Sequence, residues 1–156
     1  MQPLPVFNRA FGGSRTGDLL HYMDAVVLPY APRIVVYYCG SNDIKGGESA
    51  EAVAGRFGEF VARLHVRLPQ TRVYFVSVNQ APEKESKRAV VDEANARVRD
   101  LCASDPRLGF IDVNAVLLDA AGCPRRELFR EDGLHLKPET YELLAGVIRP
   151  VVEEAW

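Results

Sequence analysis

Two spacings of hydrophobic residues alternate along the chain, and they predict the order of its secondary structure. Residues 34–38 form a continuous apolar run, which is typical of a strand covered on both faces. Residues 73–78 are interpreted as a second buried strand, and residues 110–113 as a short strand. The shorter run at residues 4–8 is also interpreted as a strand. Each run is followed by a segment whose apolar residues recur at intervals of three and four, as on one face of a helix.

The helical segments are predicted at residues 18–28, 49–68, 87–104 and from Pro138 to about residue 148 or beyond. Ser49 suits the N-cap of the second helix, and Pro138 suits the first turn of the last. Four strand–helix repeats indicate an α/β protein with a parallel sheet that carries helices on both faces. Because no repeat or linker interrupts the pattern, we expect a single domain over residues 1–156.

Polar and glycine-rich segments follow the predicted strands. They lie at residues 12–14, 40–43 and 79–80, and the carboxyl ends of parallel strands are where such sheets form their sites. The Gly12-Gly13 pair allows close backbone approach to a ligand or forms a simple tight turn. The side-chain amide of Asn42 either donates to a developing oxyanion or closes an Asx-turn. Asp43 is expected to hold its loop together.

Asp132 and His135 stand three residues apart, just before the last predicted helix. At this spacing the carboxylate can accept a hydrogen bond from one ring nitrogen and leave the other nitrogen free to take a proton. This is the general-base half of a hydrolase triad, although an Asp near a His on a protein surface is also common.

Composition and motifs exclude several functions. The net charge of -2 and the absence of a basic run give no support for nucleic-acid binding. No apolar stretch is long enough to span a membrane, and no signal peptide is visible, so the sequence assigns no compartment. The three cysteines, without a C-x-x-C pair, are interpreted as structural, and neither a metal nor a cofactor is expected. The absence of a phosphate-binding loop disfavours a nucleotide- or flavin-binding protein.

Three segments together resemble signature blocks of the SGNH (GDSL-type) hydrolases: residues 8–14, 40–43 and 132–135. The resemblance extends over residues 5–150 and implies a flavodoxin-like, three-layer α/β/α fold. It implies that the substrate is a small acyl ester, cleaved through a serine acyl-enzyme without a cofactor. By the same resemblance, Gly13 and Asn42 form the oxyanion hole, His135 is the general base and Asp132 orients it.

The chain departs from this family at the block that carries the nucleophile, because no Gly-Asp-Ser sequence is present. We interpret the chain as shortened at its N-terminus and lacking the first, nucleophile-bearing strand. Unpaired strand edges would then favour self-association. Ser14 and Ser41 are candidate substitute nucleophiles, although both positions also suit backbone shaping. The sequence thus predicts an ester hydrolase of the carboxylesterase or acetylesterase type; the alternative is a non-catalytic acyl- or carbohydrate-binding remnant of the same fold.

Overall fold

The computed structural model describes residues 4–156, in which three parallel strands form one sheet. The strands are β1 (Ile34–Tyr37), β2 (Arg72–Val76) and β3 (Leu108–Ile111), in the order β1-β2-β3. Ile34 lies opposite Arg72, and Val73 lies opposite Leu108. The carboxyl ends of the strands therefore point to the same edge of the sheet.

Long and short helices connect and flank the strands. The long helices are α4 (Ala50–Arg67), α5 (Arg88–Ala103) and α7 (Thr140–Ala155). The short α-helices are α1 (Thr16–His21), α2 (Met23–Val26), α3 (Ser41–Lys45) and α6 (Asn114–Leu117). The 3₁₀ turns are η1 (Leu28–Tyr30), η2 (Pro82–Lys87) and η3 (Arg126–Leu128).

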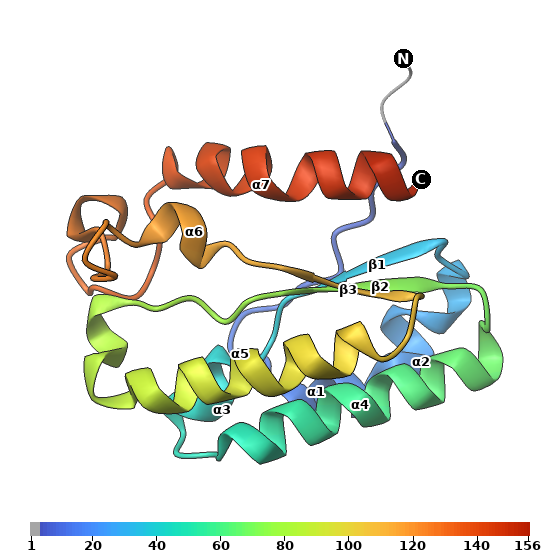
Figure 1. The fold of residues 1–156 in the computed structure, drawn as a ribbon. Helices are drawn as coiled ribbons and strands as arrows, with labels where there is room; N and C mark the ends of the chain where they lie inside the picture. Colours follow the sequence, from blue (N-terminus) through green and yellow to red (C-terminus); the bar gives the residue numbers. More distant parts are fainter. Residues whose placement is uncertain (1–3) are drawn as a thin grey trace.

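The helices cover both faces of the sheet, so the protein is a three-layer α/β/α structure, as predicted. In Figure 1, α7 and α6 lie above the sheet, and α4 and α5 lie below it. A separate apolar core fills each interface. In the lower core the rings of Tyr37 and Phe75 are stacked, and Phe57 meets both of them edge-on. The upper core joins Ile111 and Leu117 to the apolar face of α7.

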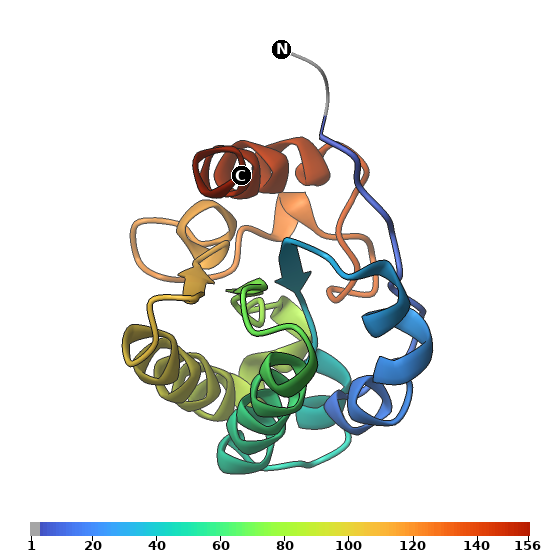
Figure 2. The ribbon, with the colours of Figure 1, turned by 90° about the vertical axis from the view of Figure 1, so that its right-hand side faces the viewer.

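One edge of β1 has no neighbouring strand in the described part of the chain. β1 pairs with β2 alone, and the N-terminal segment with α1 and α2 lies beyond its other edge (Figure 2). The strand predicted at residues 4–8 is wrong: these residues form no ladder, and Val6 and Phe7 are exposed. A strand needs a partner for its backbone groups, and among residues 4–156 no strand pairs with this segment.

Other predicted boundaries shift for local reasons. The helix predicted at residues 18–28 begins at Thr16 and breaks at Tyr22 into α1 and α2. β2 ends at Val76 instead of residue 78, because the side chain of Asn95 bonds both backbone groups of Val78 and replaces a neighbouring strand. Ser49 caps α4 as predicted, accepting from the Ala52 N–H at 3.1 Å.

Candidate functional site

Asp132 and His135 form a hydrogen-bonded pair in the turn before α7. Asp132 Oδ2 lies 2.6 Å from His135 Nδ1, and Asp132 Oδ1 accepts from the backbone N–H groups of Leu134 and His135 at 2.9 Å. Gly133 between them adopts a φ of 64°, which is favourable for glycine and closes the turn. The backbone itself therefore holds the carboxylate against the ring.

The hydrogen bonds around Asp132 favour its ionised carboxylate and determine which ring nitrogen of His135 carries the hydrogen. The hydrogen bond from His135, followed by those from the two backbone N–H groups, holds the pKa of the Asp132 carboxyl well below its usual range. An ionised carboxylate only accepts hydrogen bonds, so Nδ1 of His135 must be the donor. The His135 side chain is 67% exposed, and its Nε2 has no partner within residues 4–156.

Asn42 and the glycine-rich loop meet at the carboxyl end of β1. Asn42 Nδ2 donates to the carbonyl oxygen of Ser14 at 2.9 Å, which uses one of its two N–H bonds and leaves the other available. Gly13 adopts a φ of 76°, and its N–H has no acceptor in the described part of the chain. The bond to Ser14 therefore holds the Asn42 amide against the loop that contains Gly13.

Gly40 is required for the turn that places Asn42. Its φ is 121°, and a Cβ at this position would lie 2.9 Å from Cγ1 of Val53. Any other residue would be strained by the backbone conformation and would collide with the core of α4. This explains a glycine two residues before Asn42.

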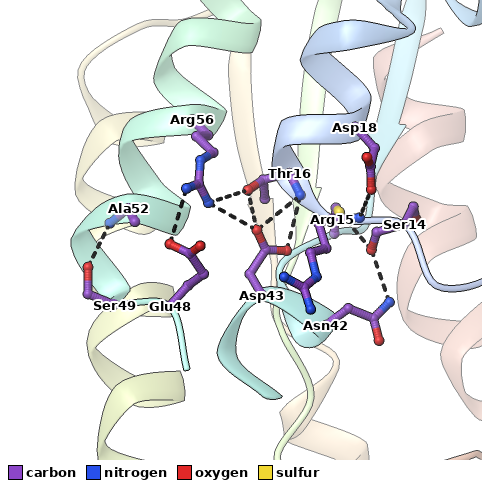
Figure 3. Close-up of polar contacts among 11 residues, drawn as sticks. Ser14, Arg15, Thr16, Asp18, Asn42, Asp43, Glu48, Ser49, Ala52 and Arg56 are labelled. Atoms are coloured by element: carbon purple, nitrogen blue, oxygen red, sulfur yellow. Dashed lines mark hydrogen bonds and ion pairs between the residues drawn. The ribbon is translucent and has the colours of Figure 1, made fainter. Parts of the chain in front are cut away.

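Asp43 is buried beneath this loop and ties it to α1 and α4 (Figure 3). Its carboxylate accepts from the Thr16 N–H at 3.0 and 3.1 Å and from the Thr16 hydroxyl at 2.5 Å. Arg56 of α4 completes the group at 3.2 Å. The expected structural role of Asp43 agrees with these contacts.

The two halves of the site are joined through η2. Glu83 donates its backbone N–H to the Gly133 carbonyl at 3.1 Å, and its carboxylate pairs with Lys45 of α3 at 3.3 Å. Neither Ser14 nor Ser41 forms a hydrogen bond with His135 within residues 4–156. The structure therefore brings Ser14 to Asn42 but brings neither serine into hydrogen-bonding contact with the imidazole.

A second polar cluster lies at the end of β2. The sequence places the polar residues 79–80 at this rim, but it did not predict the buried Lys84 beside them. Lys84 is buried and donates to Asn79, which also accepts from Tyr38. A lysine next to Pro and two Glu residues gives no sign of burial, so only the packing of η2 reveals it.

Within residues 4–156, no group of three or more His, Cys, Asp or Glu side chains is placed to hold a metal ion. None of the helices described is both long enough and apolar enough to cross a membrane. Cys39 lies at the rim, but burial raises the pKa of its thiol to about 12, which keeps it protonated at neutral pH.

The family model of the GDSL-like lipase/acylhydrolases matches residues 1–143 of this sequence. The chain belongs to this family. Comparison with curated proteins gives no match.

Solved structures of similar fold include a GDSL-like lipase and a lipase/acylhydrolase. A GDSL-like lipase from Bacteroides thetaiotaomicron is 19% identical, with a TM-score of 0.78, and covers 92% of this chain and 73% of its own. A lipase/acylhydrolase from Enterococcus faecalis is 21% identical, with a TM-score of 0.73, over 91% of this chain and 72% of its own.

A third structure of similar fold is a carbohydrate esterase. This carbohydrate esterase family 3 protein from Talaromyces cellulolyticus is 19% identical, with a TM-score of 0.77, over 91% of this chain and 68% of its own. At these identities the three structures show the fold that this GDSL-like family member shares, and each contains additional chain.

Proposed function

We propose that this chain provides the base and oxyanion-binding parts of a serine ester hydrolase of the carboxylesterase or acetylesterase type. The observation that carries the proposal is the Asp132–His135 pair at 2.6 Å with a free Nε2, in a chain of the GDSL-like family. A small acyl ester is the substrate that this chemistry suits.

In the proposed reaction, a serine hydroxyl attacks the acyl carbon while Nε2 of His135 takes its proton. Asp132 holds the ring in the tautomer that leaves Nε2 unprotonated and stabilises the imidazolium that forms. The Gly13 N–H and the second N–H of Asn42 donate to the oxyanion, each worth about 3 kcal/mol of transition-state stabilisation. His135 then protonates the leaving alcohol. In the second half of the reaction, His135 takes a proton from a water molecule that attacks the acyl carbon, and it returns this proton to the serine as the acid is released.

The serine in this scheme requires a position beside Nε2 of His135. We propose that a Gly-Asp-Ser segment paired to the free edge of β1 supplies it. Backbone groups at this edge have no strand partner in the described residues, and a parallel strand there would end at the same rim as Asn42.

The first test is hydrolysis of a short-chain nitrophenyl ester by the chain as given, with His135→Ala, Ser14→Ala and Ser41→Ala measured alongside. The same assay is then repeated with a Gly-Asp-Ser strand fused before residue 1. We expect the fusion to turn over substrate and His135→Ala to reduce its rate about a thousandfold or more.

The results distinguish three cases: a substitute nucleophile, the proposed mechanism and the non-catalytic alternative. Loss of activity in Ser14→Ala or Ser41→Ala would identify a substitute nucleophile in place of the added serine. Hydrolysis that survives His135→Ala would contradict the proposed mechanism. Binding of acetylated sugars without turnover in either form would establish the non-catalytic alternative.

A further inference from the structure

Lys84 is a buried charged side chain at the rim that the proposed reaction does not use. It is 1% exposed, and its Nζ donates to Oδ1 of Asn79 at 2.8 Å and to the backbone oxygen of Asn79 at 3.2 Å. Burial lowers the pKa of its ammonium group to about 8, so the group is mostly charged at neutral pH. Burying a cation is costly, and here its hydrogen bonds are both directed to one residue.

These contacts determine the orientation of the Asn79 amide. A lysine cannot accept a hydrogen bond, so the atom facing it must be the carbonyl oxygen of the side chain. The same oxygen accepts from the Tyr38 hydroxyl at 3.1 Å. Desolvation raises the pKa of Tyr38 to about 12, so this hydroxyl remains a donor at neutral pH. Two donors on Oδ1 turn the amide nitrogen to the opposite side.

The amide nitrogen of Asn79 is left free and accessible. It has no hydrogen-bond partner within residues 4–156, although the residue is only 6% exposed. In this part of the chain Tyr37 Oη is the buried side-chain polar atom without a partner. Asn79 Nδ2 must therefore reach solvent.

Asn79 lies beside the candidate active site. Tyr38 precedes Asn42 by four residues at the end of β1, and Asn79 follows the adjacent strand β2. Lys84 belongs to η2, the segment that bonds the Asp132–His135 turn through Glu83 and Gly133. Asn79 is therefore held between the two halves of the site.

We propose that Asn79 Nδ2 is a further substrate-binding donor, which holds an oxygen acceptor of the ester beyond the oxyanion, and that Lys84 and Tyr38 are positioning residues for it. This rests on the proposed hydrolase function and narrows its substrate class. The positive charge of Lys84 on Oδ1 strengthens the Nδ2–H dipole, which favours a hydroxyl, carbonyl or carboxylate oxygen. Oxygen-rich esters such as acetylated sugars fit this site better than alkyl esters.

The test measures ligand binding and not turnover, so it does not require the nucleophilic serine. The chain as given is titrated with an acetylated methyl xyloside while its side-chain amide signals are followed by ¹H–¹⁵N NMR. The Asn79 signals are assigned by their loss in Asn79→Asp. We expect them to shift saturably, while the signals of Asn95, whose amide is hydrogen-bonded to Val78, stay in place as an internal control.

Variants separate positioning from folding. We expect Asn79→Asp and Lys84→Met each to weaken binding about tenfold, the usual effect of losing one well-placed hydrogen bond. Tyr38→Phe removes only one hydroxyl from a half-exposed ring and should weaken binding by a smaller factor in a folded protein. His135→Ala should leave the Asn79 shift unchanged, which separates this inference from the hydrolase mechanism.

Two outcomes would overturn the inference. If the ring signals of His135 shift while those of Asn79 do not, the ligand enters the site without contacting Asn79. If neither shifts, the site does not take oxygen-rich esters. In both cases the esterase assay remains a separate measure of the proposed function.

Discussion

Asp43 lies inside the molecule, whereas the adjacent Asn42 lies partly exposed at the rim of the sheet. The two side chains start from the same turn of α3, and the helix directs one inward and one outward. Asp43 therefore holds the loop in place, and its neighbour Asn42 is free to contact a substrate. The hydroxyl and N–H of Thr16 and the guanidinium of Arg56 all depend on the Asp43 carboxylate.

Replacing Asp43 with Ala should therefore destabilise the protein strongly. We expect the free energy of unfolding to fall by about 3 kcal/mol, because a buried donor and a partly buried cation lose their acceptor. Urea denaturation measures this change. Glu48→Ala is the matched control, since Glu48 pairs with the same Arg56 but lies partly exposed, and should cost less than about 1 kcal/mol. Equal effects of the two substitutions would contradict the role given to Asp43.

In the described residues β3 and β1 are the two edge strands of the sheet. At the scale of elements, β1 is the one that the proposed nucleophile-bearing segment would complete. Its residues are those of a central strand, apolar and β-branched, yet Val36 is 44% exposed and one edge has no strand beside it. An exposed apolar edge of this kind is a template for pairing with another chain.

We therefore propose that the chain as given self-associates through β1. Analytical ultracentrifugation should show a mass that rises with concentration, and Val36→Lys should reduce the association because a charge on the edge strand opposes pairing. Val66→Lys is the control, since Val66 is 81% exposed and belongs to α4, not to a strand. A concentration-independent monomer would contradict this proposal.

At the scale of the whole molecule, buried ionisable groups make stability depend on pH. The folded pKa of Lys84 is about 8, below its ordinary 10.5, so the unfolded chain binds more protons between these values. Stability from this group therefore rises with pH over that interval. The raised pKa values of Cys39 and Cys102 act in the opposite direction, because their thiols ionise more readily in the unfolded chain.

Comparison with Lys84→Met isolates the lysine from these opposing groups. We expect the difference in free energy of unfolding, wild type minus variant, to increase from about pH 8 to about pH 10.5. Denaturation at a series of pH values measures it. Parallel stability curves for the two proteins would show that Lys84 is not desolvated as described.

The sequence by itself determined the three strands of the sheet, the long helices and the Asp132–His135 pair. A continuous apolar run such as residues 34–38 is buried on both sides when it forms a strand inside a covered sheet. The three- and four-residue spacing of apolar residues in α4 gives that helix one apolar face, which packs on the sheet. The pair was predictable because three residues of one turn separate the two side chains, and chain geometry alone brings them within reach.

Tertiary structure decided everything that depends on which distant segments meet. Residues 4–8 have a strand-like sequence but no partner strand, so they remain unpaired. The bond from Asn42 to Ser14 joins residues 28 apart in the chain, and that from Tyr38 to Asn79 joins residues 41 apart. The Tyr38–Asn79 contact follows from the order and register of β1 and β2, and the Asn42–Ser14 contact follows from the packing of the N-terminal loop against the end of β1. Local patterns carry no record of that order, because each strand is compatible with several neighbours until the whole sheet has formed.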